Sequence, residues 1–553
     1  MLRMFRQRLR QFHRYRQIAR ILTKHGFDYF VHLFRLADLV AYPRRLVTRR
    51  QRTVYRMSAP ERFRIMLQEL GPTFIKLGQI MSTRADLLPQ NYISELEKLQ
   101  DRVPPVRFED ISKQVEQSLN RPLADIFAHF EEEPLAAASI AQVHRATLKT
   151  GEDVVVKVQR PGVAELTAVD VQILRDFAYL AEKHTAWGQI YSFTEMADEF
   201  ADTIAEETDF RVEGRHADTI RHNFDTDDRV YIPKVYWDFT AKEVLTMEYV
   251  DAVKLNNLQA LEAAGIDRSS LARTLADVLL RQILIDGVFH ADPHPGNLAV
   301  LPDGRLVFMD LGIIGNLTPQ ARDHIGTMVL GLVKRSAEMV SRAIIEMGQV
   351  PPTVNKDALQ RDIYKLQQKY YEIPLSQINI TESLTELLQV AFKHRIKLPN
   401  ETTMVIKALI TTDGVVKKLD PRISIVEIAE PIGRRILQER FNPRRLQALL
   451  AEKLPQYAHL LEQFPFQVSE LLEQATGGTF KLNQENPALN RLANNAGKWI
   501  NRLVWGFITG TLFITAGLFA DIGYRLFNTF EVVDAALVTA FGLLLWLLLT
   551  SRR

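Results

Sequence analysis

The sequence contains no cysteine. This absence excludes a disulfide framework, a cysteine-ligated zinc or iron–sulfur site, and a cysteine nucleophile. It suits a compartment in which disulfides are not needed, most simply the cytosolic face of a membrane. Internal repeats and low-complexity tracts are also lacking, and the N-terminal segment has neither the long apolar core nor the small-residue cleavage site of a secretory signal peptide. The 553 residues are enough for about three or four domains.

The net charge of +3 hides a strongly basic N-terminus. Residues 1–56 hold 15 Lys and Arg but only two acidic residues, so the rest of the chain carries a net charge of −10. The first turns interleave arginines with a narrow apolar stripe made of Leu2, Phe5, Leu9 and Phe12. This pattern predicts a basic helical arm on an anionic membrane surface. The alternative is a solvated basic helix that packs on its own protein.

Two uncharged runs lie near the C-terminus, of 18 residues (503–520) and 16 residues (535–550). They are slightly short for a hydrocarbon core of about 30 Å, and nearby Trp505, Tyr524 and Trp546 would extend the match at the interfaces. Because basic residues precede the first run and follow the second, we expect a transmembrane hairpin over 503–550 with both ends in the cytoplasm. A buried core hairpin or a re-entrant segment is the alternative. A polar linker, 475–490, precedes it.

Between these ends the sequence predicts an α+β domain. Residues 57–130 have helical periodicity, and a β-branched run, Val154 to Val158, predicts a strand within 131–250. Further short strands are expected at 230–235 and 244–249. In 251–320 a helix runs to Asp286, and a hairpin over 298–309 turns at Pro302-Asp303-Gly304. Residues 321–474 are expected to be helical.

The stretch around that hairpin has the residues of a phosphoryl-transfer site. Asp292 and Asn297 stand in the spacing D-x-x-x-x-N, and Asp310 follows beyond the hairpin. Such a site needs a carboxylate at the acceptor hydroxyl and two oxygen ligands for Mg²⁺ on the phosphates. We therefore predict that Asp292 is catalytic and that Asn297 and Asp310 bind metal. His290 and His294 could suggest another metal site, but we expect His290 to pack beneath the catalytic loop.

The upstream parts of a kinase-like site are present in order. Lys157 ends the predicted strand, where the phosphate-binding lysine of kinases stands. Alanines replace the glycines of the phosphate loop about 20 residues earlier, so the nucleotide must be held differently; an ordinary packed helix start is the alternative. A carboxylate must pair with Lys157, and the segment AEETDFRVEG offers Glu206, Glu207, Asp209 and Glu213. We favour Glu207, with Glu213 as the alternative. The strand before Val250 resembles the segment that holds adenine, near Glu248.

Four motifs together resemble the UbiB/ADCK (AarF-like) group of atypical kinase-like proteins, of the bacterial type with C-terminal spans. They are FIKLGQ with Lys76, Gly78 and Gln79; PLAAASIAQVHRA; EETDF with Glu207 and Asp209; and FHADPHPGN with MDLG. They span about residues 74–312 in family order.

The resemblance implies a protein-kinase-like bilobal fold with an N-terminal helical K-x-G-Q extension and a C-terminal helical extension. It implies that the chain binds ATP and Mg²⁺, with the nucleotide on Lys157, Glu207, Glu248, Val250 and the loop residues Leu135, Ala136, Ala137, Ala138, Ser139 and Val143. Lys76 and Gln79 share one helix face and would gate the site with Glu207 or Asp209. The alternative is that Lys76 merely caps or salt-bridges a surface helix.

The function implied is that of a membrane-associated ATPase that supports ubiquinone or other isoprenoid-quinone biosynthesis. Its expected partners are a membrane lipid or quinone intermediate and quinone-biosynthesis enzymes, without nucleic acid, at the inner (plasma) membrane with the kinase-like domain on the cytoplasmic side. The alternatives are a genuine protein or small-molecule kinase and a nucleotide-regulated scaffold for a biosynthetic complex. The sequence leaves the acceptor, the quinone and the oligomeric state undefined.

Overall fold

The computed structural model describes residues 2–36, 57–82, 88–99, 103–185, 188, 192–351, 354–370, 379–440, 525–526 and 530–531. The chain divides into two units, Met1–Arg445 and Leu446–Arg553. In the second unit the described residues form one short antiparallel pair, β12 (Arg525–Leu526) and β13 (Phe530–Glu531). The predicted linker 475–490 and the predicted spans 503–520 and 535–550 lie outside the described residues. Within the described ranges, no helix has both the length and the apolar character needed to cross a membrane.

An antiparallel sheet in the first unit carries the predicted lysine strand. Its order is β1-β3-β4-β6, and β2 pairs with the edge of β3. The strand predicted from the valine run is β4, which places Lys157 opposite Val143 of β3 and Leu245 of β6. The bounds are β1 (Phe127–Phe130), β2 (Ala136–Ala137), β3 (Ala141–Leu148), β4 (Asp153–Gln159) and β6 (Val244–Glu248).

The sheet begins earlier than the sequence suggested. Residues up to 130 were expected to be helical, but β1 pairs with β3 through Phe127, His129 and Phe130. Two helices, α7 (Phe108–Leu119) and α8 (Leu123–Ile126), lead into β1, and α7 contacts β4 and β6. Ile111 and Val115 of α7 are buried with the valines of β4. These helices therefore belong with the sheet rather than with the helical extension.

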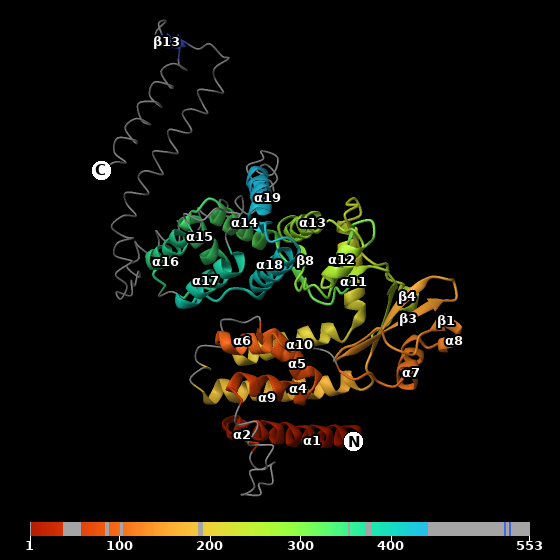
Figure 1. Cartoon of the computed structure of the whole chain (residues 1–553). Helices are drawn as coiled ribbons and strands as arrows, with labels where there is room; N and C mark the ends of the chain where they lie inside the picture. The colour runs from red at the N-terminus through yellow and green to blue at the C-terminus, as the bar shows by residue number, and fades with distance from the viewer. Residues whose placement is uncertain are drawn as a thin grey trace. The chain divides into compact units, whose positions relative to one another are not determined.

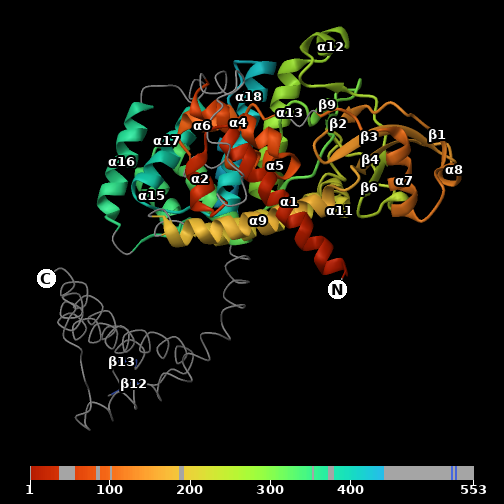
Figure 2. The same cartoon turned by 90° about the horizontal axis from the view of Figure 1, so that it is seen from below.

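The N-terminal extension consists of helices that precede β4 in the sequence and of two helices, α9 (Val163–His184) and α10 (Phe193–Glu207), that follow β4 and pack against them. The preceding helices of the extension are α1 (Leu2–Lys24), α2 (Asp28–Leu33), α4 (Ala59–Leu70), α5 (Pro72–Ser82) and α6 (Gln90–Leu96). The α4 helix begins at a capping box in which Ser58 accepts from the Glu61 amide and Glu61 accepts from that of Ser58. Figures 1 and 2 show α1 and α5 beside α9, and contacts between α1 and α9 and between α5 and α9 confirm it; α4 contacts α1 and α5.

The α1 helix buries a different face from the one that the sequence emphasised. Ile18, Ala19 and Leu22 are buried against α4 and α9, whereas Leu9 and Phe12 remain exposed. Arg14 is buried too: its Nε and Nη2 donate to the Asp170 carboxylate of α9 at 2.6 and 2.8 Å. Nη2 also donates to the Leu70 carbonyl at 2.6 Å. This face of α1 therefore packs on the protein itself, which was the alternative to the membrane prediction. The membrane prediction now concerns the opposite face, with Leu9 and Phe12.

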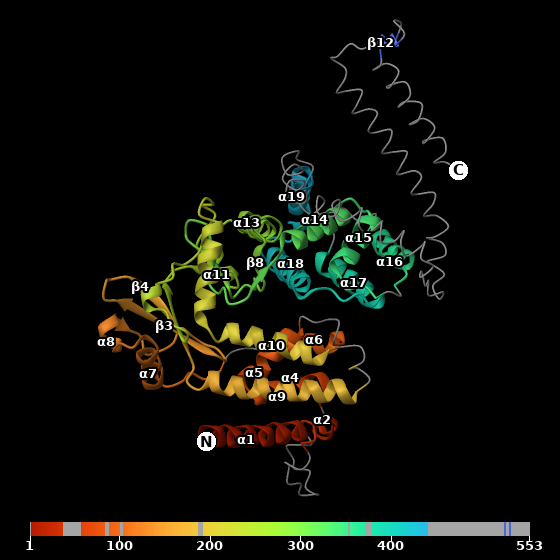
Figure 3. The same ribbon diagram turned by 180° about the vertical axis from the view of Figure 1, so that it is seen from behind.

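The helix α11 (Phe210–Asn223) connects the extension to the sheet and to residues 251–320, which hold the predicted catalytic residues and are called the catalytic half below. It follows α10 after one turn (Figure 3), and Asp209 caps it by accepting from the Arg211 amide. A small second sheet has the order β5-β10-β9-β7. Its β9–β10 pair is the predicted hairpin, and Gly304 takes the positive φ of its turn. The bounds are β5 (Val230–Tyr231), β7 (Val253–Lys254), β9 (Leu298–Val300) and β10 (Leu306–Phe308).

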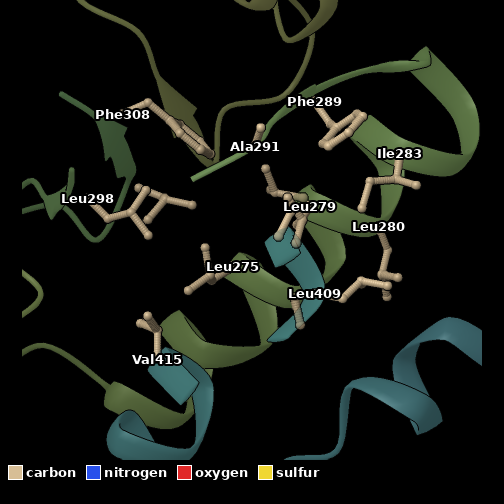
Figure 4. Packing of buried hydrophobic residues seen from close by; sticks show 14 of the residues in the cluster. Leu275, Leu279, Leu280, Ile283, Phe289, Ala291, Leu298, Phe308, Leu409 and Val415 are labelled. Atoms are coloured by element: carbon tan, nitrogen blue, oxygen red, sulfur yellow. The ribbon is translucent and has the colours of Figure 1, made fainter. Parts of the chain in front are cut away.

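The catalytic half rests on the buried helix α13 (Arg268–Arg281), which Asp267 caps. It continues as one π-turn, η4 (Gln282–Asp286), so the predicted helix to Asp286 ends where expected. Figure 4 shows Leu275, Leu279 and Ile283 of this helix packing against Leu298, Phe308 and Leu409. The remaining elements here are α12 (Leu258–Ala263), β8 (Val288–His290) and β11 (Ile314–Asn316), the last two paired. The short helix η3 (Trp237–Phe239) instead contacts β6 of the first sheet.

The expected helical region follows as α14 to α19. The bounds are α14 (Pro319–Val333), α15 (Ala337–Met347), α16 (Lys356–Lys369), α17 (Ile380–Lys393), α18 (Asn400–Leu419) and α19 (Ile425–Arg440). The helix α18 contacts α13 and β11, so this region packs directly beneath the catalytic loop. The part of the prediction from residue 441 to 474 lies outside the described residues.

Replacing Arg14 by alanine tests whether α1 is part of the folded body. The change leaves Asp170 buried without its cation, which costs about 3–5 kcal/mol for a broken buried pair. We expect a clearly lower free energy of unfolding in urea, whereas Arg16→Ala, on the exposed side of α1, should change it by less than about 0.5 kcal/mol. Equal stability of the two variants would contradict the assignment of α1 to the core.

Candidate functional site

Lys157 is the centre of a buried charge network. Its ammonium donates to both carboxylate oxygens of Glu213 on α11, at 2.9 and 2.8 Å, and lies 3.5 Å from Asp310 Oδ2. Burial alone would lower the pKa of Lys157, but the charges of Asp310 and Glu213 outweigh it and raise that pKa. Burial likewise opposes ionisation of Asp310, yet Lys157 and the Gly312 amide hold the pKa of that carboxyl well below its usual range. Both groups are therefore charged at neutral pH.

The preference for Glu207 as the partner of Lys157 is wrong. Glu213 fills that place because α11 starts at its Asp209 cap and turns Glu213 toward the sheet, where it is almost fully buried. Glu207 ends α10 and pairs instead with Lys76 of α5, at 2.6 Å between Nζ and Oε1. Asp209 pairs with Arg211 rather than with Lys76.

The K-x-G-Q helix α5 lies against the alanine-rich loop. Ile140 of that loop packs with Leu77 and Ile80, which flank Gln79 on α5. A Cβ on Gly78 would lie 2.4 Å from Leu99 and 2.8 Å from Leu67, so the glycine permits the close approach of α4 and the chain after α6. The charge of Lys76 also contributes to lowering the pKa of Asp310. The extension therefore contacts the alanine-rich loop through apolar side chains, and the charge of its Lys76 acts on Asp310.

The alanine-rich loop is a strand and a tight turn rather than a helix start. Ala136 and Ala137 form β2, and the Ala138 amide donates to the Ala141 carbonyl at 2.8 Å. Arg160 Nη1 donates to the Ala138 carbonyl at 3.2 Å and fixes the turn from outside. Ser139 is buried, whereas Leu135 is exposed and Val143 is half-buried.

The predicted adenine strand pairs with β4 through Glu248 and Val154. Its glutamate side chain turns to the second sheet, where Oε1 accepts from the Tyr231 hydroxyl at 2.6 Å and Oε2 accepts from the Lys234 amide at 3.2 Å. Burial and this hydrogen bond raise the pKa of Tyr231 to about 12. The Glu248 amide donates to the Lys234 carbonyl at 2.8 Å, so the carbonyl of Glu248 and the backbone of the half-buried Val250 are the groups that the predicted adenine segment would present.

The hairpin brings the three predicted catalytic-half residues together. The Met309 amide donates to the Asn297 carbonyl at 2.8 Å, so Asp310 follows directly beside Asn297. Asn297 Nδ2 donates to the Asp292 carbonyl at 3.3 Å, which leaves its amide oxygen for another partner. The Asp292 carboxylate lies 3.4 Å from the ammonium of Lys407, on α18.

His290 supports this loop from below, as predicted. Its ring is buried against Phe308, and Nδ1 lies 3.3 Å from the Ile313 carbonyl. The His290 amide donates to the buried Gln282 side chain. Within the described ranges, no group of three or more His, Asp or Glu side chains is placed to hold a metal ion. Asn297 and Asp310 remain a two-ligand set of hard oxygens.

Comparison with known proteins agrees with this geometry. A model of the ABC1 atypical kinase-like domain matches residues 98–344, and one of the UbiB helical domain matches residues 363–424. A protein named probable protein kinase UbiB, from Marinobacter nauticus, is 33% identical over 78% of this chain and 80% of its own length. The chain belongs to the UbiB family of atypical kinase-like proteins.

Other proteins are similar to this chain over comparable lengths. ACTIVITY OF BC1 COMPLEX KINASE 7, a chloroplastic protein of Arabidopsis thaliana, is 34% identical over 85% of this chain and 68% of its own length. An uncharacterised protein of Synechocystis is 36% identical over 87% of this chain and 83% of its own length. The expected family resemblance is therefore confirmed, and with it the kinase-like fold of mixed helix and sheet.

Two residues at this UbiB-family site escaped the sequence analysis. His216 of α11 has Nδ1 3.1 Å from the carbonyl of Leu311, directly after Asp310, and links α11 to the segment that carries Asp310. Lys407 reaches Asp292 from a helix far along the chain. The helix phase of α11 places His216 near Glu213, but nothing local to either sequence segment indicates these contacts.

The buried His290 predicts a pH dependence of stability. Burial lowers the pKa of His290 more than nearby Asp310 raises it, so the native ring is neutral. The unfolded chain binds a proton there near pH 6.5, so this residue's share of the stability is present above that pH and is lost on acidification.

We expect the melting temperature of His290→Gln to fall less steeply than that of the wild type between about pH 7 and pH 5. The difference in unfolding free energy should reach at most about 1.4 kcal/mol per pH unit. His129→Gln, an exposed position on β1, should keep the wild-type slope. Parallel profiles for wild type and His290→Gln would contradict a neutral buried His290.

Proposed function

We propose that this protein is a membrane-associated atypical kinase-like ATPase that supports ubiquinone or other isoprenoid-quinone biosynthesis. The observation that carries the catalytic part is the juxtaposition of two groups of polar side chains. Lys157 and Glu213 form a largely buried ion pair, which the half-exposed Asp310 joins, and Asp292 and Asn297 adjoin it through the hairpin. A lysine for the phosphates, oxygen ligands for a divalent ion and a carboxylate for the acceptor are the parts that phosphoryl transfer requires.

The donor set fits Mg²⁺. Asp310 is ionised and about half exposed, and Asn297 uses its Nδ2 to donate to the Asp292 carbonyl, so its amide oxygen can bind an ion. Mg²⁺ is commonly held by one or two protein oxygens together with phosphates and water, so a two-ligand site suffices. Asn297 and Asp310 would hold the ion, which would neutralise phosphate charge.

In the proposed reaction Asp292 orients the acceptor hydroxyl and accepts its proton. A bond forms between the acceptor oxygen and the γ-phosphorus, and the bond from that phosphorus to the β–γ bridging oxygen breaks, so ADP leaves. Lys157 binds the phosphates, with the nucleotide under the alanine-rich loop and its base against the backbone of Glu248 and Val250. With water as acceptor, the products are ADP and phosphate.

Proximity of the N-terminal extension supports an ATPase over a protein kinase. The Lys76–Glu207 pair is largely buried, and α5 packs on the alanine-rich loop through Ile140. A peptide acceptor would have to compete with this packing, whereas water or a small hydroxyl group would not. A genuine protein or small-molecule kinase and a nucleotide-regulated scaffold stay as alternatives. Transfer of radiolabel from ATP to a defined acceptor, lost in Asp292→Asn, would favour the kinase.

Membrane association is proposed from both ends of the chain. The basic arm presents the exposed Leu9 and Phe12 beside its arginines, which suits an anionic surface. The 503–550 segment, with its two uncharged runs, is proposed as the inner-membrane anchor that keeps the kinase-like domain on the cytoplasmic side. A membrane lipid or quinone intermediate and quinone-biosynthesis enzymes are the proposed partners.

Replacing Asp310 by asparagine tests the catalytic part. The variant loses the charge that binds the divalent ion, so we expect Mg²⁺-dependent ATP turnover to fall at least about 100-fold. Phosphate release by the full-length chain measures this, and Asp303→Asn, an exposed turn residue of the same hairpin, should retain wild-type turnover. Undiminished turnover in Asp310→Asn would sink the assignment.

Lipid extraction from a strain without this chain tests the biosynthetic part. We expect an isoprenoid-quinone precursor to accumulate, and the wild-type chain, but not Asp310→Asn, to reverse it. Reversal by a variant that binds ATP without hydrolysing it would point to the scaffold instead. A normal quinone profile would remove the biosynthetic role while leaving the ATPase proposal standing.

A further inference from the structure

The catalytic loop has a cation beside it that the kinase-like domain does not supply. Between His290 and Asn297 the sequence HADPHPGN contains neither lysine nor arginine. The ammonium of Lys407 lies 3.4 Å from Asp292 Oδ1. Lys407 falls within the UbiB helical domain, beyond the residues that match the kinase-like domain.

The other two lysines at the site are held elsewhere. Lys157 is bound by Glu213 and Asp310, and Lys76 by Glu207. Lys407 is thus the cation that the structure pairs with Asp292. Both side chains of this pair are about one-third exposed, so the pair opens toward solvent and is accessible to an acceptor.

The backbone of Lys407 is firmly placed. Val405, Ile406 and Ala408 beside it are buried, and Leu409 lies beside Leu280 at the end of α13 (Figure 4). The same helix contacts β11, which follows Asp310 and Gly312. A side chain that extends from so well-packed a helix is pre-organised, because its Cα cannot move without disturbing the core.

The N-terminal extension contributes a second carboxylate near this ammonium. Burial raises the pKa of Glu97, which follows α6, and the charge of Lys407 partly offsets that rise. The charge of Lys407 therefore acts on a carboxylate of the extension, while its ammonium lies 3.4 Å from Asp292.

We propose that Lys407 is a positioning residue for Asp292, supplied by the helical domain. Its ammonium holds one carboxylate oxygen of Asp292, so that the other faces the acceptor hydroxyl. It also reduces the repulsion between the Asp292 carboxylate and the incoming γ-phosphoryl group, because two negative charges at close range oppose each other strongly outside bulk water. The inference rests on the proposed function, since it assigns a role in that reaction.

Steady-state kinetics on the full-length chain tests this role. We expect Lys407→Met to lower kcat for ATP turnover by about 10- to 100-fold, the size of effect that misplacement of a catalytic group produces, while KM for ATP changes by less than about threefold. Lys407→Arg, which retains the charge and the reach, should restore most of kcat. Lys418→Met, an exposed lysine of the same helix, should match the wild type.

A double-mutant cycle separates positioning from a merely structural effect. If Lys407 works through Asp292, adding Lys407→Met to Asp292→Asn should lower turnover by less than about twofold. A structural loss would instead reduce turnover by the same factor in both backgrounds, and that result would overturn the inference. Wild-type kcat in Lys407→Met would overturn it too.

The Asp310→Asn variant keeps the two proposals apart. An inactive Asp310→Asn beside a fully active Lys407→Met refutes only the role of Lys407. Full activity in Asp310→Asn refutes the proposed ATPase itself, whatever Lys407→Met does.

Discussion

The ion pair between Lys157 and Glu213 is the contact on which the rest of the site depends. It joins the middle of the sheet to α11 in a largely buried setting, where removing either charge leaves the other uncompensated. With α11 held there, His216 meets the Leu311 carbonyl, and Asp310 comes within 3.5 Å of Lys157. One largely buried ion pair thus fixes β4, α11 and residues 310–311 relative to one another.

The same helix couples this network to the N-terminal extension. Only one residue separates Glu207 from Asp209. Glu207 pairs with Lys76 of the extension, which precedes it in the chain, and Asp209 caps α11, which follows it. A shift of α11 that separated Glu213 from Lys157 would also move the end of α10. The packing of Ile140 against α5 adds a second connection, from the extension to the alanine-rich loop. The extension is therefore held to the candidate site by both an ion pair and apolar packing.

The sequence was informative where local chemistry decides the structure. The valine run predicts β4, Pro302 to Gly304 predict the hairpin turn, and that hairpin suffices to bring Asp310 to Asn297. The choice between Glu207 and Glu213 failed because four acidic residues crowd one segment, and only the point at which α11 begins decides which of them faces Lys157. Strand β1 was missed because its partner, β3, is what makes Phe127 to Phe130 extended.

The buried face of α1 was missed for a related reason. Leu9 and Phe12 form the more regular apolar stripe, but Asp170 of α9 buries Arg14 and so selects the neighbouring face. The periodicity of apolar residues identifies the most hydrophobic face of a helix. It contains no information about a carboxylate distant in sequence that stabilises a buried arginine.

Lys407 shows the same limit at the catalytic loop, and it bears on how the site is built. The network contains the carboxylates of Asp292, Asp310, Glu213 and Glu207, and the ammonium groups of Lys157, Lys76 and Lys407. Each lysine comes from a different part of the chain: the sheet, the N-terminal extension and the helical domain. Because like charges at close range repel, the carboxylates are stable together only when all three parts are assembled. Without the two helical parts, Asp292 would lack Lys407 and Asp310 would lack the charge of Lys76, which gives a physical reason for these parts to accompany the kinase-like domain.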